Sequence, residues 1–410
     1  MNCRHCSTAL HPFDDVFVDL GSAPPSNAFL RAHDLERAEL HLPLKVLTCS
    51  NCRLVQVDEL QKHDALFSDD YVYFSSYSST WLAHAERFVD AVASRLQLNQ
   101  NSLVVEVASN DGYLLQFVQA RGIPCVGFEP TASTADAARA RGIESIGEFF
   151  GVSAAQEFVR ARGFADLIVA NNVLAHVPDI NDFVGGFREL LSANGTITVE
   201  FPHLLQLVNQ AQFDTVYHEH FSYLSLATVQ RIFATQGLIV WDVEELPTHG
   251  GSIRIWAQHA SNTRSVTPRV QSLLATEAKA GMMGPDFYRT LQARAERIKD
   301  DLVAFLIDCK RDGKRVVGYG AAAKGNTLLN FAGVRSDLVS CVADVSPHKQ
   351  GRFLPGSRIP VVSPSVIDSE KPDFIVVLPW NIRDEVTTQL AHAREWGAQF
   401  VTAVPELTVQ

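Results

Sequence analysis

The sequence lacks any long apolar run. No stretch of about 18 apolar residues occurs, which is the length expected of a membrane-spanning helix, and the N-terminal residues MNCRHCSTAL contain no signal-peptide core. Positive charge is also in deficit, because 35 Lys and Arg stand against 46 Asp and Glu, a formal net charge of −11. Such a chain is repelled by nucleic acids and by anionic membranes. These absences predict a cytoplasmic enzyme with neither nucleic-acid nor membrane partners.

Internal repeats and low-complexity tracts are absent too, and the remaining composition is that of a globular protein. The 410 residues are 46% hydrophobic and 20% charged, which is enough material for two or three domains. We expect three of them: a small module at 1–70, a central domain at 71–312 and a smaller domain at 313–410.

Four of the seven cysteines form two pairs, Cys3-x-x-Cys6 and Cys49-x-x-Cys52. Two such knuckles together provide four thiolates, the ligand set of a tetrahedral Zn²⁺ site. The alternative is a pair of redox dithiols, but a redox CxxC usually opens a helix after a strand, and neither pair has that context. Four protein ligands leave no position for water, so the predicted zinc is structural.

From about residue 100 onward, strand-like and helix-like segments alternate. The expected strands of the central domain are 103–109, 125–130, 144–149, 166–173 and 195–202, followed by an edge pair at 238–246 and 252–259. A charged helical segment is expected over about 268–312, and a second alternation has strands near 315–323, 338–345, 374–380 and 400–404. This order predicts an α/β protein with a central doubly wound, Rossmann-like sheet and a smaller Rossmann-like domain after it.

The ends of the central strands predict the cofactor. Ligands of a doubly wound sheet bind beyond the carboxyl ends of its strands. The loop EVASNDGYLL at 106–115 lacks the GxGxxG that a pyrophosphate requires, whereas Glu129 stands where a carboxylate accepts ribose hydroxyls. A ribose-binding acid without a pyrophosphate loop indicates a nucleoside cofactor without phosphates, of which S-adenosylmethionine is the common one. Another ligand on the same fold is the alternative.

The residues that we expect around this cofactor all lie at or near the ends of the first four strands. Phe149 would stack on an adenine, and Asn171 and Asn172 would lie under the methionine end. The full predicted set is Glu106, Ala108, Ser109, Asn110, Gly112, Glu129, Pro130, Phe149, Asn171 and Asn172.

The two CxxC pairs and six motifs carry a family resemblance. The motifs are YVYFSSYSSTW (71–81), EVASNDG (106–112), NNVLAHVPDINDF (171–183), YHEHFSYLS (217–225), HGGSIRIW (249–256) and GYGAAAKGNTLLN (318–330). Over its whole length the chain resembles the sugar C-methyltransferases of deoxysugar pathways, which methylate C3 of a nucleotide-linked 4-keto-6-deoxy sugar. The resemblance implies a methyltransferase domain at 71–312 and a nucleotide-sugar-binding domain at 313–410. It leaves the nucleotide open among dTDP, CDP and GDP. One departure is Ala108, where the family usually has glycine; we expect it to be tolerated.

The motif YHEHFSYLS suits this chemistry, because methylation at carbon needs a carbon nucleophile. A 4-keto group acidifies the C3 hydrogen, a histidine near neutral pKa can remove it, and positioned donors can stabilise the enolate. The resemblance implies that His220 is the base, with Tyr217 and Glu219 beside it and His176 opposite. Two alternatives are a second metal site built from His218, Glu219 and His220, and a merely structural cluster.

The expected substrate residues fall into two groups. In the first, Tyr71, Tyr73 and Ser76 would line the sugar pocket. The other predicted substrate-binding residues of this group are His218, Tyr223, His249 and Arg254. His249 has turn chemistry as its alternative, and Arg254 would contact either a phosphate or the sugar. The second lies in the GYGAAAKGN loop, where a helix N-terminus and a lysine favour an anion: Tyr319, Lys324 and Asn326. This loop is not a Walker loop. The alternative interpretation is that the C-terminal domain only packs against the rest of the chain and binds no substrate. Rival functions are an O- or N-methyltransferase, an NAD-dependent oxidoreductase and a non-catalytic zinc protein.

Overall fold

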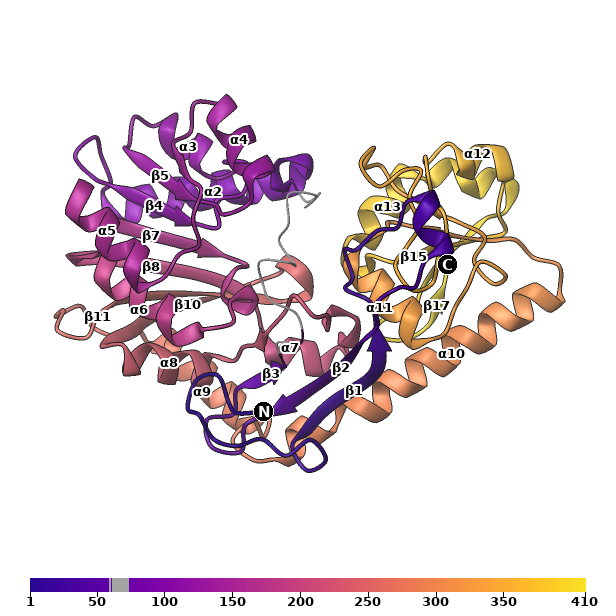
Figure 1. Cartoon of the computed structure of the whole chain (residues 1–410), viewed down its shortest axis with the longest axis horizontal. Coiled ribbons are helices and arrows are strands. Elements are labelled where there is room, and N and C mark those ends of the chain that lie inside the picture. The colour runs from indigo at the N-terminus through magenta and orange to yellow at the C-terminus, as the bar shows by residue number, and fades with distance from the viewer. Residues whose placement is uncertain (59, 61–73) are drawn as a thin grey trace.

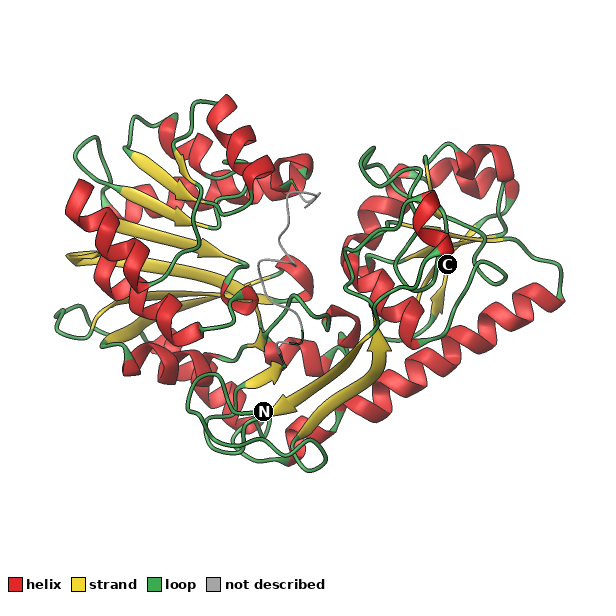
Figure 2. Ribbon diagram, in the orientation of Figure 1, coloured by secondary structure: helices red, strands yellow, loops and turns green. Residues whose placement is uncertain are grey.

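The computed structural model describes residues 1–58, 60 and 74–410. Tyr71 and Tyr73, two of the predicted sugar-pocket residues, lie outside the described residues. Two α/β units lie side by side in Figure 1, and the N-terminal strands β1 and β2, in indigo, run between them above the long helix α10. Figure 2 shows the yellow strands of both units enclosed by red helices. Among the described residues, no helix combines the length and apolar character needed to cross a bilayer.

The central sheet has seven strands in the order β10-β11-β8-β7-β4-β5-β6. The strands are β4 (Val104–Val107), β5 (Cys125–Phe128), β6 (Ser145–Ile146), β7 (Ala165–Asn171), β8 (Leu191–Pro202), β10 (Leu238–Leu246) and β11 (Ser252–His259). Strands β4 to β8 pair in parallel, and β11 pairs antiparallel with both β8 and β10. The strand order reverses between β4 and β7, where ligands of doubly wound sheets bind. The predicted doubly wound fold is confirmed.

The described residues from 79 to 235 form seven α-helices, which lie before and between the strands of this sheet in the sequence. They are α2 (Ser79–Leu96), α3 (Leu115–Gln119), α4 (Ala132–Ala140), α5 (Val152–Arg162), α6 (Ile180–Leu190), α7 (Leu204–Asn209) and α8 (Leu226–Thr235). Helix α6 begins after Asp179, whose carboxylate accepts the backbone N–H groups of Asn181 and Asp182 at 3.1 and 2.9 Å. Such a cap fixes the first turn of a helix. It therefore fixes the end of the loop that follows His176.

The N-terminal module shares its sheet with the histidine-rich motif. Its strands are β1 (Val16–Ala23), β2 (Leu42–Thr48) and β3 (Val55–Val57), and the fourth strand is β9 (Ser222–Tyr223) from the middle of the chain. Strand β3 pairs antiparallel with β9 through Val55 opposite Tyr223 and Gln56 opposite Ser222. The N-terminal module is thus joined to the histidine-rich motif. The sequence did not predict this long-range strand pairing.

The C-terminal sheet has six strands in the order β14-β13-β12-β15-β16-β17. They are β12 (Val316–Tyr319), β13 (Val342–Ala343), β14 (Val361–Val362), β15 (Phe374–Val377), β16 (Gln399–Thr402) and β17 (Thr408–Val409), with helices α11 (Ala323–Phe331), α12 (Val366–Glu370) and α13 (Arg383–Gln389). All neighbouring strands are parallel except β16 and β17. The four predicted strands are present, and β14 and β17 are short additions. The predicted domain boundaries stay a prediction.

The helix expected over 268–312 is wrong as a single element. The chain forms α9 (Pro268–Lys279), a 3₁₀ turn at Asp286–Arg289 and then α10 (Leu291–Arg311). Gly281 adopts φ +88°, a left-handed conformation that ends helices. Pro285 also disfavours helical geometry at the preceding residue. Helix α10 is then free to run beneath the C-terminal unit, as Figure 1 shows.

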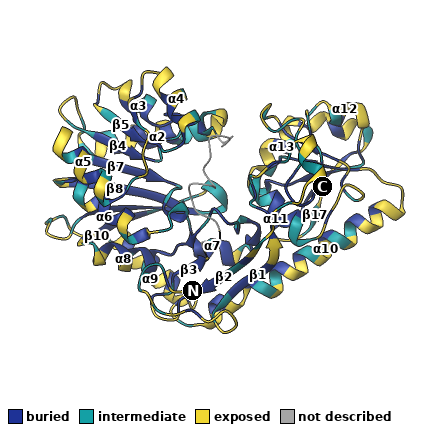
Figure 3. Cartoon of the chain, in the orientation of Figure 1, coloured by how far each residue is buried: buried dark blue, intermediate teal, exposed yellow. Residues whose placement is uncertain are grey.

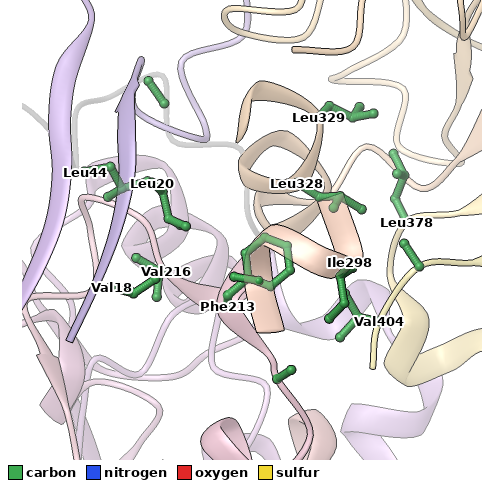
Figure 4. Close-up of a cluster of buried hydrophobic side chains, with 14 of the residues drawn as sticks. Val18, Leu20, Leu44, Phe213, Val216, Ile298, Leu328, Leu329, Leu378 and Val404 are labelled. Carbon is green, nitrogen blue, oxygen red and sulfur yellow. The ribbon is translucent and has the colours of Figure 1, made fainter. Parts of the chain in front are cut away.

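A shared hydrophobic core holds the units together. Figure 3 shows the strands of both units largely in dark blue, with exposed residues concentrated on outer helix faces and loops. In the close-up of Figure 4, Val18 of β1, Phe213, Val216 and Leu328 of α11 lie in one buried cluster. Burying a large apolar side chain is worth about 1.5–3 kcal/mol, so Phe213 and Val216 anchor the start of the YHEHFSYLS segment firmly between the two units.

Candidate active site

The four paired cysteines converge on one point. The Sγ atoms of Cys3, Cys6, Cys49 and Cys52 all lie within 4.8 Å of one another, with 3.5 Å between Cys3 and Cys52 and 3.6 Å between Cys6 and Cys49. Zinc–sulfur bonds of about 2.3 Å in a tetrahedron require sulfur atoms about 3.8 Å apart. The four sulfurs therefore fit Zn²⁺, with no fifth group needed.

Each cysteine pair sits in a knuckle rather than at a helix start. The backbone N–H of Ser7 donates to the Cys3 carbonyl and that of Arg53 to the Cys49 carbonyl, both at 2.9 Å. Ser7 and Arg53 adopt φ of 59° and 64°, so the chain turns back directly after each pair. All four cysteines are free thiols. The geometry favours the metal site over redox dithiols, which usually open a helix.

The loop after β4 has an unusual backbone. Ala108, Asn110 and Gly112 adopt φ of 58°, 49° and 77°. A left-handed alanine costs about 1–2 kcal/mol relative to the right-handed conformation, while glycine does not have this penalty. Alanine in place of the family's usual glycine at position 108 therefore adds backbone strain, and its methyl group also occupies space.

Glu129 at the end of β5 holds this loop in place. One carboxylate oxygen accepts the backbone N–H of Asn110 and the other that of Thr131, both at 2.9 Å. Glu129 is buried, and burial raises the pKa of its carboxyl group. Each oxygen keeps a second lone pair for a ribose hydroxyl. Glu129 can therefore hold the loop and bind S-adenosylmethionine, the methyl donor, at the same time.

Several buried acceptors at this cleft have no protein partner. The side-chain Oδ1 atoms of Asn171 and Asn172, at the end of β7, are buried without a hydrogen bond. Glu106 is fully buried on β4, and burial raises the pKa of its carboxyl group well above its usual range. Unpaired buried acceptors are costly unless a ligand satisfies them. Amide oxygens beside a buried acid fit the ammonium group of S-adenosylmethionine.

The other residues predicted to bind S-adenosylmethionine differ in exposure. Phe149 is 47% exposed after β6, and Pro130 is half-buried, so both can meet a cofactor. Ser109 is fully buried behind the loop, and its Oγ lies 2.2 Å from where a Cβ on Gly127 would stand. Ser109 thus supports the loop from behind, and Gly127 must stay small to admit it.

His220 occupies the centre of the histidine-rich segment. Its Nδ1–H donates to the carbonyl of Thr215 at 2.9 Å, and its ring lies 3.9 Å from that of Tyr217 and 4.6 Å from that of His176, centroid to centroid. Tyr223 lies 6.0 Å away on β9. Burial holds the pKa of His220 well below its usual range, and nearby His176 lowers it further.

His176 reaches this cluster from the 3₁₀ turn Leu174–His176 that follows β7. Its Nδ1–H donates to the Glu219 carbonyl at 2.8 Å. Burial lowers its pKa to about 4, so the ring is neutral at physiological pH. The structure brings His176, Tyr217, His220 and Tyr223 together, as the sequence predicted.

Glu219 and His218 contact the N-terminal module. Glu219 Oε2 accepts the side-chain N–H of Asn27 at 3.0 Å, and burial raises its pKa to about 7. His218 donates from Nε2 to the carbonyl of Pro43 in β2 at 3.2 Å. Because 218–220 form a turn, the two histidine rings do not share a strand face. Within the described residues, the only group of metal-ligand side chains is the four-cysteine site, so the alternative second metal site finds no support there.

Comparison with known proteins identifies the family. Three family models match the chain: a proposed zinc-binding domain at 3–67, a methyltransferase domain at 81–243 and a C-methyltransferase C-terminal domain at 247–405. C-methyltransferase NovU of Streptomyces niveus is 35% identical over 406 residues, which cover 98% of this chain and 95% of that protein. The chain belongs to the C-methyltransferase family.

Similar solved structures are more distant. A methyltransferase of Anabaena variabilis that depends on S-adenosylmethionine is 15% identical, covering 50% of this chain and 99% of that one, with a TM-score of 0.39. Magnesium protoporphyrin IX methyltransferase of Synechocystis, solved with SAH bound, is 16% identical over 43% of this chain and 84% of that one, with a TM-score of 0.34.

As a C-methyltransferase, the enzyme uses S-adenosylmethionine. The cleft beside Glu129 offers hydrogen-bond partners that fit this cofactor. The N-terminal module binds zinc through its four clustered cysteines. The resemblance inferred from the six motifs is confirmed for methyl transfer to carbon. The donor and the zinc were the two cofactors that the sequence predicted. The roles of single residues stay predictions.

In this C-methyltransferase three predicted substrate-binding residues have other contacts. Ser76 donates to a carboxylate oxygen of Asp111 and accepts from Arg141 at 2.9 Å, so it fastens the segment before α2 onto the donor loop. Arg254 is 5% exposed and pairs with Glu200 at 2.5 Å. These positions favour structural roles for Ser76 and Arg254. His218, against Pro43, is similarly placed away from the ring cluster.

His249 does reach the cleft. Its backbone is left-handed, with φ 53°, and its Nε2 accepts the side-chain N–H of Asn172 at 3.3 Å. Its ring lies 5.3 Å from that of Trp81, and burial lowers its pKa to about 4. His249 therefore links the predicted donor site to the wall formed by α2.

The three predicted residues of the GYGAAAKGN loop have different surroundings. Lys324 donates to Asn381 at 2.7 Å and lies 4.6 Å from the ring centroid of Trp380. Tyr319 is buried in the core between β12 and α13, with its hydroxyl 3.3 Å from Gln389. Asn326 is 1% exposed, and its Nδ2 donates to the Ser26 carbonyl at 2.7 Å. Tyr319 and Asn326 thus contact other parts of the fold, while the Oδ1 of Asn326 is buried without a hydrogen-bond partner; their substrate contacts stay predictions.

Sequence reasoning missed Asp214 and Trp380. Trp380 donates from Nε1 to Asp214 Oδ2 at 2.7 Å, which ties the C-terminal unit to the segment just before the histidine-rich motif. Asp214 is fully buried, and burial raises its pKa to about 6. Trp380 follows β15 closely, so the strand-end rule could have included it. Asp214 carries no such signal, because its partner lies 166 positions away.

Replacing Glu129 by Gln is expected to weaken donor binding about 10- to 100-fold, because hydrogen bonds to a charged group are worth about 1.5–3 kcal/mol. The amide would present an N–H₂ group to a backbone N–H and remove one acceptor for ribose. Titration calorimetry with S-adenosylmethionine measures this. Glu148→Gln is the matched control, since Glu148 is exposed just after β6. Equal affinities of the two variants would contradict the assignment of Glu129.

Proposed function

We propose that this enzyme methylates C3 of a nucleotide-linked 4-keto-deoxy sugar, with His220 as the general base. The observation that supports it best is the hydrogen bond from His220 Nδ1–H to the Thr215 carbonyl at 2.9 Å. That bond assigns the proton to Nδ1 and leaves the lone pair on Nε2. A neutral imidazole with a defined acceptor nitrogen is what abstraction of a carbon-bound proton requires.

The deprotonation is a single proton transfer. Nε2 of His220 takes the C3 proton, the electron pair of the C–H bond becomes the enolate, and negative charge develops on the C4 oxygen. Bound S-adenosylmethionine supplies the methyl group to C3. Asn171, Asn172 and Glu129 would orient that donor at the ends of β5 and β7.

The tautomers limit which groups can stabilise the enolate oxygen. His176 donates its Nδ1–H to Glu219 and is neutral, so its Nε2 is an acceptor and cannot donate to an oxyanion. This arrangement favours a proton-relay role for His176 over polarisation of the ketone. Tyr217, whose ring lies tilted against that of His220, is the hydrogen-bond donor that we propose for the enolate oxygen.

The acceptor's nucleotide is proposed to lie toward Lys324. Burial is the main cause of the lowered pKa of His220 and of His249, and the Lys324 ammonium lowers both further, so its charge acts on the ring cluster. A cation beside Trp380 suits the diphosphate and base of dTDP, CDP or GDP. The nucleotide, the sugar and the stereochemical outcome at C3 are open, and a cytoplasmic location stays a prediction.

The deciding experiment is solvent exchange. Incubating the enzyme with a nucleotide-linked 4-keto-6-deoxy sugar in D₂O should introduce deuterium at C3 without donor. With donor, NMR should locate the new methyl group on C3. A methyl group on oxygen or nitrogen, or no deuterium at C3, would reject the proposal in favour of an O- or N-methyltransferase. A thermal-shift comparison of S-adenosylmethionine with NAD tests the oxidoreductase alternative.

The acid limb of the rate profile is expected below pH 6.5. Because burial lowers the pKa of His220, the base stays unprotonated, and kcat/KM is maintained, as the pH falls through 6.5, the usual value for histidine. Activity is then lost as the pH falls through the lowered pKa. Glu219, with a pKa of about 7, is tested separately by Glu219→Gln. An acid limb at or above pH 6.5 that persists in this variant would contradict His220 as the base.

A further inference from the structure

Arg4, between the two cysteines of the first knuckle, contacts three separate segments near the ring cluster. Its Nη1 donates to the carbonyl of Pro178 at 2.7 Å, and its Nη2 donates to the carbonyl of Val57 at 2.6 Å. The guanidinium carbon lies 5.3 Å from the ring centroid of Phe221, within the range of a cation–π contact. Pro178 follows His176 by two residues, and Phe221 follows His220 directly.

His5, the next knuckle residue, contacts the same loop a few residues further on. Its Nδ1 is 2.8 Å from Oδ1 of Asn181, and Nδ2 of Asn181 donates to the His5 carbonyl at 2.9 Å. Asn181 lies in the first turn of α6, which Asp179 caps. The knuckle therefore holds the loop 176–181 at two points, with Arg4 at Pro178 near its middle and His5 at Asn181 at its end.

The catalytic segments lack long regular elements of their own. His176 stands in a three-residue 3₁₀ turn, and β9 has two residues. Strand β3 supports β9, and the Val57 N–H donates to the Phe221 carbonyl at 3.2 Å. Arg4 binds the carbonyl of the same Val57. A permanently charged guanidinium with a planar fork suits such simultaneous contacts, and lysine has no equivalent fork.

We propose that Arg4 and His5 are positioning residues, through which the zinc knuckle sets the distance between the His176 loop and the His220 segment. This inference rests on the proposed function, since it assigns the two histidines to one reaction. It gives the zinc site a part in catalysis that the four ligands alone do not imply. The metal fixes the Cys3–Cys6 loop, and the loop fixes the two segments.

The test compares Arg4→Met and Arg4→Lys with Ser50→Ala. Ser50 occupies in the Cys49–Cys52 knuckle the place that Arg4 occupies in the first, and it is exposed. Hydrogen-exchange mass spectrometry should show faster deuterium uptake in 174–181 and 217–223 for Arg4→Met. Arg4→Lys should lie between Arg4→Met and the unaltered enzyme, which Ser50→Ala should match. Zinc content should stay at one ion per chain in all of them.

Kinetics provide a second readout. We expect Arg4→Met to lower kcat by roughly 10²-fold, the scale of an ångström-sized misplacement, while KM for S-adenosylmethionine stays within about twofold of the unaltered enzyme, because the donor residues lie on other strands. Arg4→Lys should recover part of kcat. A loss spread equally over kcat and donor KM would indicate general destabilisation and overturn the proposal.

Asn181→Ala makes the test independent of the zinc loop, because it removes the His5 contact from the opposite side. It should raise deuterium uptake in 174–181 with zinc retained. The proposal is overturned if Arg4→Met and Asn181→Ala both leave exchange in these segments unchanged, or raise it throughout the chain. The exchange readout needs no acceptor, so it stands even if the 4-keto sugar proves not to be the substrate.

Discussion

Replacing His220 by Asn is expected to lower kcat by about 10²–10⁴-fold, the usual contribution of a general base. The amide can still donate to the Thr215 carbonyl, but it offers no basic nitrogen in place of Nε2. Deuterium incorporation at C3 without donor should be lost to the same extent, because it reports the same proton transfer. Affinity for S-adenosylmethionine should be unchanged, since the donor residues lie on β4, β5 and β7.

His259→Asn is the matched control for that variant. His259 also places a ring nitrogen against a backbone carbonyl, that of Leu191 at 3.1 Å, but it lies at the end of β11, near residue 191 at the start of β8. The same substitution there should leave kcat and C3 exchange within a few-fold of the unaltered enzyme. If His220→Asn retained C3 exchange, the base would be another group, and His176 would be the first to examine.

The parts of the fold that the sequence predicted depend on local patterns. The two CxxC pairs needed only ligand chemistry to indicate one metal site, and their sulfurs converge as expected. The alternation of strands and helices indicated the doubly wound sheet, because each strand is short, apolar and followed by a helix-like segment. The strand-end rule then located Glu129 and Asn172, whose side chains lie at the cleft.

The sequence could not predict contacts between distant segments. On a strand, His218 and His220 would share a face, but 218–220 form a turn, and His218 contacts Pro43, 175 positions away. Arg254 pairs with the buried carboxylate of Glu200, 54 positions away. Asn326 likewise reaches Ser26, 300 positions away. Periodicity and motif spacing contain no information on such pairings, because these depend on how the three sheets pack.

The register between β3 and β9 is the most consequential of these distant contacts. It makes the N-terminal module a structural neighbour of Tyr223 and, through Val57, of Phe221. The hydrophobic packing agrees with this strand pairing, because Cys3, Cys49 and Cys52 are buried in the same cluster as Leu224 and Leu226. Loss of the metal should consequently affect the ring cluster as well as the module.

Replacing Cys52 by Ser is expected to abolish stoichiometric zinc binding and to lower the free energy of unfolding by about 4 kcal/mol or more, because structural zinc supplies folding energy directly. Cys52 is 5% exposed and lies 3.5 Å from Cys3, so the variant leaves a hydroxyl where the metal needs a thiolate. Metal analysis by mass spectrometry and thermal unfolding measure the two effects. Methyl transfer should fall together with them, since Arg4 and β3 lose their anchor.

Cys309→Ser separates the loss of metal from the loss of a buried thiol. Cys309 is 6% exposed on α10 and belongs to no metal-ligand group, so the same substitution should keep one zinc per chain. It should destabilise the protein only by the cost of a buried hydroxyl, about 1–3 kcal/mol. If Cys52→Ser retained zinc, or destabilised the enzyme no more than Cys309→Ser, the four cysteines would not be a structural metal site.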